Sequence, residues 1–158
     1  MKKVIGLSFV LGILLSCHLA TAAPLAVGDA IPAVAAKDQH GAAYTFTNGT
    51  AFLLVAVEMD AAKAANQKLA AEGAGYLEKH GATYLMDIHP MPGIAKVFAL
   101  PKMRKYPHRI VLIETKGVLN WAPSKPGHVT LLALNPEGRV SKISYWNPAS
   151  ESASGLFK

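Results

Sequence analysis

The stretch that decides the fold is Ala51-Phe-Leu-Leu-Val-Ala-Val-Glu-Met59, which runs directly into Asp60-Ala-Ala-Lys63 and an Ala-rich segment. The nearly continuous apolar run is typical of a strand that is buried on both faces, as in the centre of a covered parallel or mixed sheet. Small or apolar residues then recur at helical spacing, and Gly81 provides a stop. We therefore expect a central strand that leads straight into a helix.

Two features set the expected limits of this helix. Asp60 can accept hydrogen bonds from the free amides of the first turn, and its charge suits the positive end of the helix dipole, so we expect it to be the N-cap. Gly73 and Gly75 each weaken a helix by about 0.5–1 kcal/mol relative to Ala, which predicts a kink or an early end there.

Strands and turns are expected before this unit. An extended segment punctuated by Gly and Pro covers residues 24–36, and Lys37-Asp-Gln-His-Gly41 has the composition of a turn between strands. A short strand follows at 43–46, and the Asn48-Gly49 turn then delivers the chain into the central strand.

After the long helix the chain alternates again. Strands are expected at 82–88 and 109–114, and the short helix between them carries Ile94, Val97 and Phe98 on one face and is ended or kinked by Pro101. A loop, a hairpin and a polar tail then occupy 116–127, 129–146 and 147–158. This order predicts one α/β domain, a sandwich with a mixed central sheet that ends in a β-hairpin.

The amino terminus has the pattern of a secretory signal peptide. Lys2 and Lys3 precede an apolar run over residues 4–15, and Ala20-Thr-Ala22 is a small-x-small cleavage site. We expect residues 1–22 to be removed and residues 23–158 to form a single domain that is periplasmic or secreted. The run is too short for a standard membrane-spanning helix, and no later segment approaches about 20 apolar residues, so the mature chain should have no transmembrane segment.

Cys17 leaves an alternative open. Leu14-Leu-Ser-Cys17 resembles a bacterial lipobox, in which the Cys is lipidated and starts the mature protein. We favour an ordinary Cys in a discarded leader, because Ala20-Thr-Ala22 is a good competing site and no flexible tether follows Cys17.

Removing the leader removes the only cysteine of the chain. The mature domain therefore has no disulfide framework, no thiol redox chemistry and no thiolate metal site. Of the 16 Lys and Arg residues, two lie in the leader, so 14 face 10 acidic residues and give a net charge of +4. This modest excess is compatible with an acidic partner surface and does not require one.

Four segments carry a resemblance to a known family. They are Val27-Gly-Asp-Ala-Ile-Pro32, Lys37-Asp-Gln-His-Gly41, the strand from Phe52 to Met59, and Thr130-Leu-Leu-Ala-Leu-Asn-Pro-Glu-Gly-Arg-Val140. In this order and spacing they resemble the thioredoxin-like superfamily, specifically its secreted peroxiredoxin and thiol-reductase-like branch. The resemblance spans about residues 25–146 and implies a thioredoxin-like α/β sandwich.

The functional residues of that family are missing. Asp60-Ala-Ala-Lys63 stands where a thioredoxin has Cys-x-x-Cys at the start of the helix. Leu53 and Val57 stand where a peroxiredoxin has Pro and Thr, and Val129 stands where a thioredoxin has its cis-proline. We therefore expect no thiol oxidoreductase or peroxidase activity, since fold alone does not imply function.

The candidate binding site is the junction itself. It comprises Asp60 and Lys63, together with His89 and His128. In the simpler interpretation, Asp60 only caps the helix and Lys63 is a solvated residue one turn along.

A metal site is a further alternative. Histidine and thioether ligands suit Cu(I), and the candidates beside loops are Met59, Met86, His89, Met91, Met103 and His108. Copper carriers of this fold rely on a Cys pair that this chain lacks, and no close repeated ligand spacing occurs. Met86 is expected to fill the core and His89 to be a turn residue, so we assign no metal and no other cofactor.

The densest basic cluster is the candidate basic patch, formed by Lys102, Arg104, Lys105 and Arg109. It suits an anionic lipid, a polyanion or an acidic protein, although such a run is usually a solvated face. The leader argues against nucleic acid as a partner, and Tyr106 alone is thin evidence for base stacking.

Together these features predict a redox-inactive periplasmic or secreted domain that acts as a binding or accessory module, with no catalytic residues. Its partner, a protein or a small molecule, is not identified by the sequence. The alternative is a small periplasmic copper carrier or non-thiol enzyme that uses the junction around Asp60 and Lys63 with nearby His and Met residues.

Overall fold

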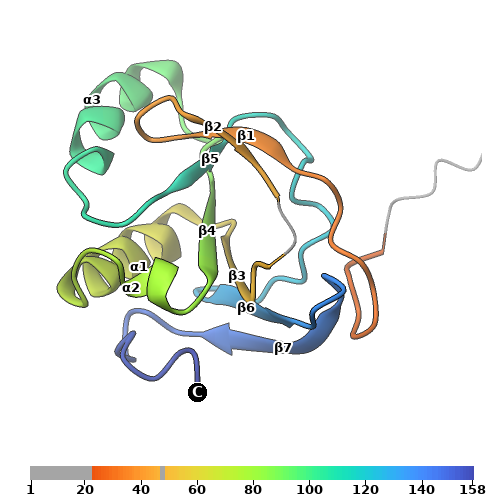
Figure 1. The fold of residues 1–158 in the computed structure, drawn as a ribbon. Helices are drawn as coiled ribbons and strands as arrows, with labels where there is room; N and C mark the ends of the chain where they lie inside the picture. Colours follow the sequence, from red (N-terminus) through yellow and green to blue (C-terminus); the bar gives the residue numbers. More distant parts are fainter. Residues whose placement is uncertain (1–22, 47–48) are drawn as a thin grey trace, which may run out of the picture.

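The computed structural model describes residues 23–46 and 49–158. In that part of the chain the strands are β1 (Ala35–Asp38), β2 (Ala43–Thr45), β3 (Phe52–Ala56), β4 (Ala82–Asp87), β5 (Val111–Ile113), β6 (Val129–Leu134) and β7 (Val140–Trp146). The helices are α1 (Met59–Ala71), α2 (Tyr76–Lys79) and α3 (Gly93–Met103). The strands form one seven-stranded mixed sheet in the order β2-β1-β5-β4-β3-β6-β7 (Figure 1).

The centre of the sheet is parallel and its two sides are antiparallel. Strand β4 pairs in parallel with both β3 and β5, whereas β1 and β6 join this core in the antiparallel sense. Leu53, Leu54 and Val55 of β3 are almost completely buried. The predicted central strand and the mixed α/β architecture are therefore confirmed.

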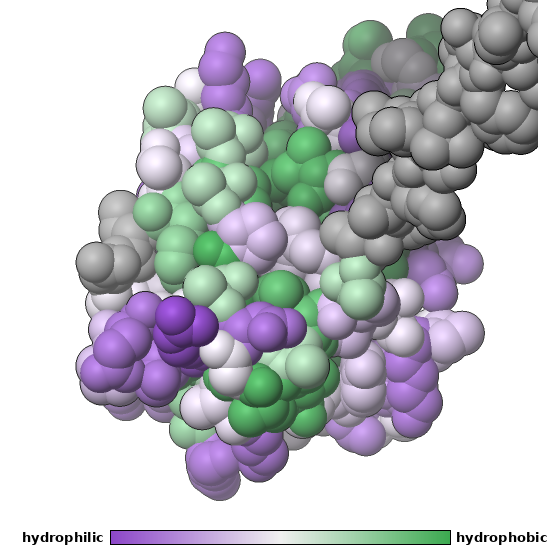
Figure 2. All heavy atoms as spheres, turned by 90° about the vertical axis from the view of Figure 1, so that its right-hand side faces the viewer, coloured by the Kyte–Doolittle hydropathy of each residue, from purple (hydrophilic) through white to green (hydrophobic). Residues whose placement is uncertain are grey.

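Two hydrophobic cores lie on opposite faces of the sheet, because successive side chains of a strand point to opposite faces. On one face, Leu54 and Met86 pack against the small residues of α1, together with Leu77 of α2 and Trp146. On the other face, Leu53, Val55 and Leu85 pack under chain segments without regular structure, chiefly residues 25–34 and 118–122. Figure 2 shows this loop-covered side, where apolar side chains gather between polar ones.

The long helix ends early, as the sequence predicts. Helix α1 stops at Ala71, Gly73 adopts a φ of +88°, and the short α2 begins after Gly75, whose φ is +80°.

The predicted N-cap was wrong. Glu58 occupies the cap position with extended backbone angles, and its carbonyl accepts the first helical hydrogen bond from Ala62 at 2.9 Å. Asp60 already lies in the first helical turn. There its charge still faces the positive end of the dipole, but it does not cap the helix.

Helix α3 does not end at Pro101, and the face marked in the sequence is exposed. It continues through Pro101 to Met103, because the carbonyl that loses its partner belongs to Val97, on a side of the helix that water can reach. The face marked by Ile94, Val97 and Phe98 points away from the core, with exposed fractions of 71%, 64% and 65%. Its opposite side, with Met103 buried and Ala99 and Leu100 half-buried, holds the helix to the protein.

The ends of the described chain are packed onto the sheet. The amino-terminal segment bridges the hairpin through Ala30 and Arg139. The tail after β7 forms turns without a helix, buries Ala153 and places Phe157 against Phe52, Tyr76 and His80. The predicted hairpin is present, with β6 and β7 antiparallel on either side of the Asn135–Gly138 turn.

The predicted leader, with Cys17, lies outside the described residues, as does Asn48 of the predicted tight turn. Among the described helices, none combines the length and apolar composition needed to cross a membrane.

Candidate functional site

The segments that carry the predicted site residues meet at one edge of the sheet. Strands β3 and β4 are parallel, with Ala56 beside Met86, so the residues after both strands emerge at the same edge. Strand β6 is antiparallel to β3, with Thr130 opposite Val55, so the residues before β6 reach that edge as well. The topology thus gathers residues 57–63, 87–89 and 126–128 there.

Each predicted site residue has its own local arrangement at this edge. Asp60 and Lys63 are exposed one turn apart on α1, while Ala61 and Ala62 between them are buried. His89 is exposed in the turn after β4, and its backbone amide donates to Oδ1 of Asp87 at 2.9 Å.

His128 is half-buried, and its Nδ1 lies 2.7 Å from the carbonyl oxygen of Pro126. In the chain outside residues 1–22 and 47–48, no hydrogen bond or ion pair connects Asp60, Lys63, His89 and His128 with one another. They therefore share an edge of the sheet without forming a bonded constellation.

Glu58 makes the connection that the sequence did not indicate. Its Oε2 accepts a hydrogen bond from the amide of Gly127 at 2.9 Å and so links the start of α1 to the loop before β6. The hydroxyl of Thr130, in β6, donates to the carbonyl of Pro123 in the loop before that strand. An acidic residue next to a helix start was the available signal, but its partner lies 69 residues away.

An open groove of about 600 Å³ lies at this edge of the sheet, but none of the predicted site residues Asp60, Lys63, His89 and His128 lines it. It is lined by Val57, which follows β3, by Asp87, which ends β4, and by Tyr145 of β7. The remaining lining residues come from the amino-terminal segment and the loop after β5, namely Pro24, Leu119, Asn120, Ala122, Pro123 and Ser124. The groove combines apolar walls with carboxylate, amide, hydroxyl and phenol groups, which is the usual composition of a binding site.

The residues that stand where thioredoxins have their thiols cannot perform thiol chemistry. A carboxylate and an ammonium group are exposed at positions 60 and 63, and the buried Val129 starts β6 where a thioredoxin has proline. These groups can bind charge and donate or accept hydrogen bonds, but they cannot form a mixed disulfide.

The methionine and histidine candidates are dispersed. Met86 is buried in the core on the side of α1, which confirms its predicted role, and Met103 is buried there too. His89 lies in a turn, as predicted. Within residues 23–46 and 49–158, no three His, Asp or Glu side chains come together in a way that could hold a metal ion.

His108 belongs to a buried polar cluster on the side of the sheet that α1 covers. Its Nε2 lies 3.0 Å from Oδ1 of Asn66 in α1, and the Asn66 amide group donates to the sulfur of Met86 at 3.7 Å. Nδ1 of His108 is buried and has no hydrogen-bond partner in the described part of the chain. The side chain is only 1% exposed, and this burial lowers the pKa of His108 to about 4.

Asp38 organises the turn after β1. Oδ1 accepts from the amides of His40 and Ala42, each at 2.9 Å, and Oδ2 forms an ion pair with Nε of Arg109 at 3.0 Å. Burial raises the pKa of Asp38, but these amides and Arg109 together outweigh it, so that the pKa lies below its ordinary value.

The predicted basic patch divides into paired and free cations. Arg109 is held by Asp38 and lies over the ring of Tyr44, 5.3 Å from its centroid. Nε of Arg104 donates to the carbonyl of Gln39 at 3.0 Å, which leaves its positive charge uncompensated. Lys102 and Lys105 are exposed.

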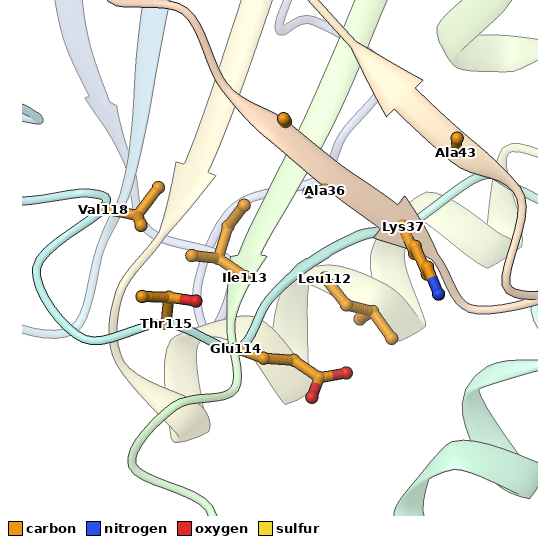
Figure 3. A pocket seen from close by; sticks show the side chains of 9 residues that line it. Ala36, Lys37, Ala43, Leu112, Ile113, Glu114, Thr115 and Val118 are labelled. Atoms are coloured by element: carbon orange, nitrogen blue, oxygen red, sulfur yellow. The ribbon is translucent and has the colours of Figure 1, made fainter.

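A second hollow of about 470 Å³ lies between β1, β5 and the residues that follow β5. Figure 3 shows mostly alanine and aliphatic side chains around it, with Lys37 and Glu114 as its charged groups. None of the predicted site residues lines it.

Comparison with solved structures shows a shared fold. The thioredoxin domain of a thiol-disulfide oxidoreductase from Bacteroides vulgatus superposes with a TM-score of 0.52 at 17% identity, over 78% of this chain and 92% of that one. A peroxiredoxin-like protein from Aquifex aeolicus gives 0.54 at 12%, over 79% and 78%. A thiol:disulfide interchange protein from Bacteroides sp. gives 0.51 at 16%, over 79% and 86%.

No family model and no curated protein sequence matches the chain. The shared feature is therefore the thioredoxin-like fold, as the sequence resemblance predicted.

Proposed function

We propose that this thioredoxin-like chain is an exported, redox-inactive domain that binds a partner at the edge where β3 and β4 end. One observation carries the proposal: the edge where β3 and β4 end has an open groove of about 600 Å³. Positions 60 and 63, which do not line the groove, hold a carboxylate and an amine where thioredoxins have thiols. Ligands of open α/β sheets bind outside the carboxyl ends of the strands, which is where this groove lies.

The lining of the groove suits the binding of a partner. Asp87, Asn120 and Ser124 offer hydrogen-bonding groups, and Tyr145 adds an amphipathic ring that is 38% exposed. Such a surface suits a peptide segment or a small polar molecule. The pattern of residues 1–22 supports export, with cleavage after Ala22.

The wild-type protein should show no disulfide reductase, isomerase or thiol-peroxidase activity, because the attacking species in all three reactions is a thiolate. The double variant D60C/K63C should form an intramolecular disulfide, since residues three apart in the first turn of a helix lie on the same side. We expect it to reduce insulin weakly. Insulin reduction and a free-thiol assay measure both properties.

Reductase activity in the wild type would disprove the redox-inactive assignment. Two unpaired thiols in D60C/K63C under oxidising conditions would instead contradict the placement of the junction.

Binding at the groove can be tested by placing a photo-cross-linking amino acid at Tyr145. Ser141 on the same strand is the matched control, because it is exposed and does not line the groove. The partner cross-linked in periplasmic extract should be enriched at position 145, and its affinity for the purified protein should fall at least about tenfold in S124W, which fills the groove. Equal cross-linking at both positions, or an unchanged affinity in S124W, would contradict the proposal.

A further inference from the structure

Helix α3 is attached to the protein by one side and presents an apolar face on the other. Ile94, Val97 and Phe98 follow helical i, i+3, i+4 spacing and are 71%, 64% and 65% exposed. In Figure 1 the helix lies at the upper left corner of the molecule, with nothing beyond its outer side. Clusters of exposed large apolar side chains are uncommon on monomeric proteins and mark contact surfaces.

The charges of the segment that contains this face have one sign. Between Asp87 and Glu114 the sequence contains no acidic residue. Lys102 follows the apolar stripe within the helix, and Arg104 and Lys105 come directly after it; all three are exposed. Arg109 does not contribute to this free charge, because Asp38 neutralises it.

We propose that this α3 face, formed by Ile94, Val97, Phe98, Lys102, Arg104 and Lys105, docks onto the surface of an anionic phospholipid bilayer. Such a surface has an outer layer of charged headgroups above the acyl chains. The apolar side chains of the helix can reach the boundary of the acyl chains, and the adjoining cations can contact the headgroup phosphates. The inference is independent of the groove and of its partner.

A second copy of the chain fits this face less well. Two copies would bring cation clusters together, and the stretch from 88 to 113 offers no carboxylate to compensate them. Three apolar side chains also bury far less than the roughly 1,000 Å² that a stable protein interface needs.

The test is co-sedimentation of the exported protein with vesicles that contain phosphatidylglycerol and phosphatidylcholine in equal amounts. Mass spectrometry checks beforehand that residues 1–22 have been removed. We expect binding that weakens as salt is added. K102Q/K105Q should lower partitioning roughly 25-fold, because each cation near an anionic surface contributes about fivefold. V97S/F98S should lower it at least about tenfold.

Matched controls come from the same chain. V27S removes an apolar side chain that is 63% exposed elsewhere, and K125Q/K142Q removes two exposed cations outside α3. Both controls should bind as the wild type does, and circular dichroism should show all variants folded.

Several outcomes would overturn the proposal: no binding to the anionic vesicles, equal binding to pure phosphatidylcholine, or binding that V97S/F98S leaves unchanged. Sedimentation velocity adds a further check. A concentration-dependent dimer that V97S/F98S abolishes, without vesicle binding, would assign the face to a second copy of the chain. Retention on an acidic protein column, again without vesicle binding, would assign it to a protein partner.

Discussion

His108 shows how a single buried residue ties stability to pH. With Nε2 directed at Asn66, the unpartnered Nδ1 is a bare acceptor, so the folded protein holds the neutral ring. Protonation of Nδ1 would bury an uncompensated charge, which is why burial lowers the pKa of His108 from 6.5 to about 4. The unfolded chain has no such restriction and takes up the proton first.

The free energy of unfolding should therefore fall as the pH decreases from 6.5 to about 4, by up to about 3 kcal/mol, and this residue should add no pH dependence above that window. Urea titrations at a series of pH values measure the slope. H108Q retains a donor for Asn66 but does not titrate, so it should remove most of that slope.

Asp38 acts at lower pH and does not obscure this measurement. Its pKa in the folded state lies below the ordinary 3.8, so its contribution is present above 3.8 and is lost as the pH falls further. A wild-type slope between pH 6.5 and 4 that persists in H108Q would contradict the role of His108.

Gly73 decides how α1 and α2 connect. In a continuous helix, G73A would stabilise the protein by about 0.5–1 kcal/mol. Gly73 instead has a φ of +88°, where any L side chain is strained, although nothing lies within 4 Å of an added Cβ. We therefore expect G73A to lower the free energy of unfolding by about 1–2 kcal/mol.

The sign of this change separates the two possibilities, and urea denaturation measures it. As a control, K68A changes an exposed residue in the last turn of α1 and should alter the free energy of unfolding by less than about 0.5 kcal/mol. Stabilisation by G73A would mean that α1 and α2 form one helix.

Local sequence signals predicted the elements that depend on local physics. Three elements could be predicted from the sequence, because periodicity and turn chemistry act within a few residues. They are the apolar run of β3, the helix break at Gly73 and the Asn135–Gly138 turn. The exposure of the α3 face could not be predicted in this way. The helical spacing of Ile94, Val97 and Phe98 indicates an apolar face but does not indicate whether another part of the protein covers that face.

The candidate site was predictable only to the level of topology. Parallel pairing of β3 with β4 explains why Asp60 and His89 share an edge. The link from Glu58 to Gly127 and the walls of the groove join segments far apart in the sequence, and no local pattern encodes such contacts.

At the scale of the whole molecule, the carboxyl-terminal tail completes one core. Phe157 stacks on His80 with centroids 4.8 Å apart and also contacts Phe52 and Tyr76, and Ala153 of the same tail is buried in this core. The tail thus extends the cover that α1 and α2 give to that face of the sheet.

Truncation of this ring should destabilise the whole domain. We expect F157A to lower the free energy of unfolding by about 2 kcal/mol, somewhat less than a fully buried Phe→Ala change because Phe157 is only half-buried. The exposed neighbour Lys158 provides the control, since K158A should have no measurable effect. Urea denaturation gives both values, and equal stability of F157A and the wild type would show that the tail adds nothing to the core.

The unequal cover of the two faces has a consequence for degradation. Helices cover one face of the sheet, whereas segments without regular structure, such as residues 114–128, cover the other. Such a segment can detach locally at a lower free energy than unfolding of the whole sheet requires. A trypsin-like protease would find the exposed Lys116 there, while Pro126 protects the bond after Lys125. A cut at Lys116 would free the segment that carries Leu119 and Trp121, uncover the apolar side of β3, and commit the molecule to removal while its helices are still folded.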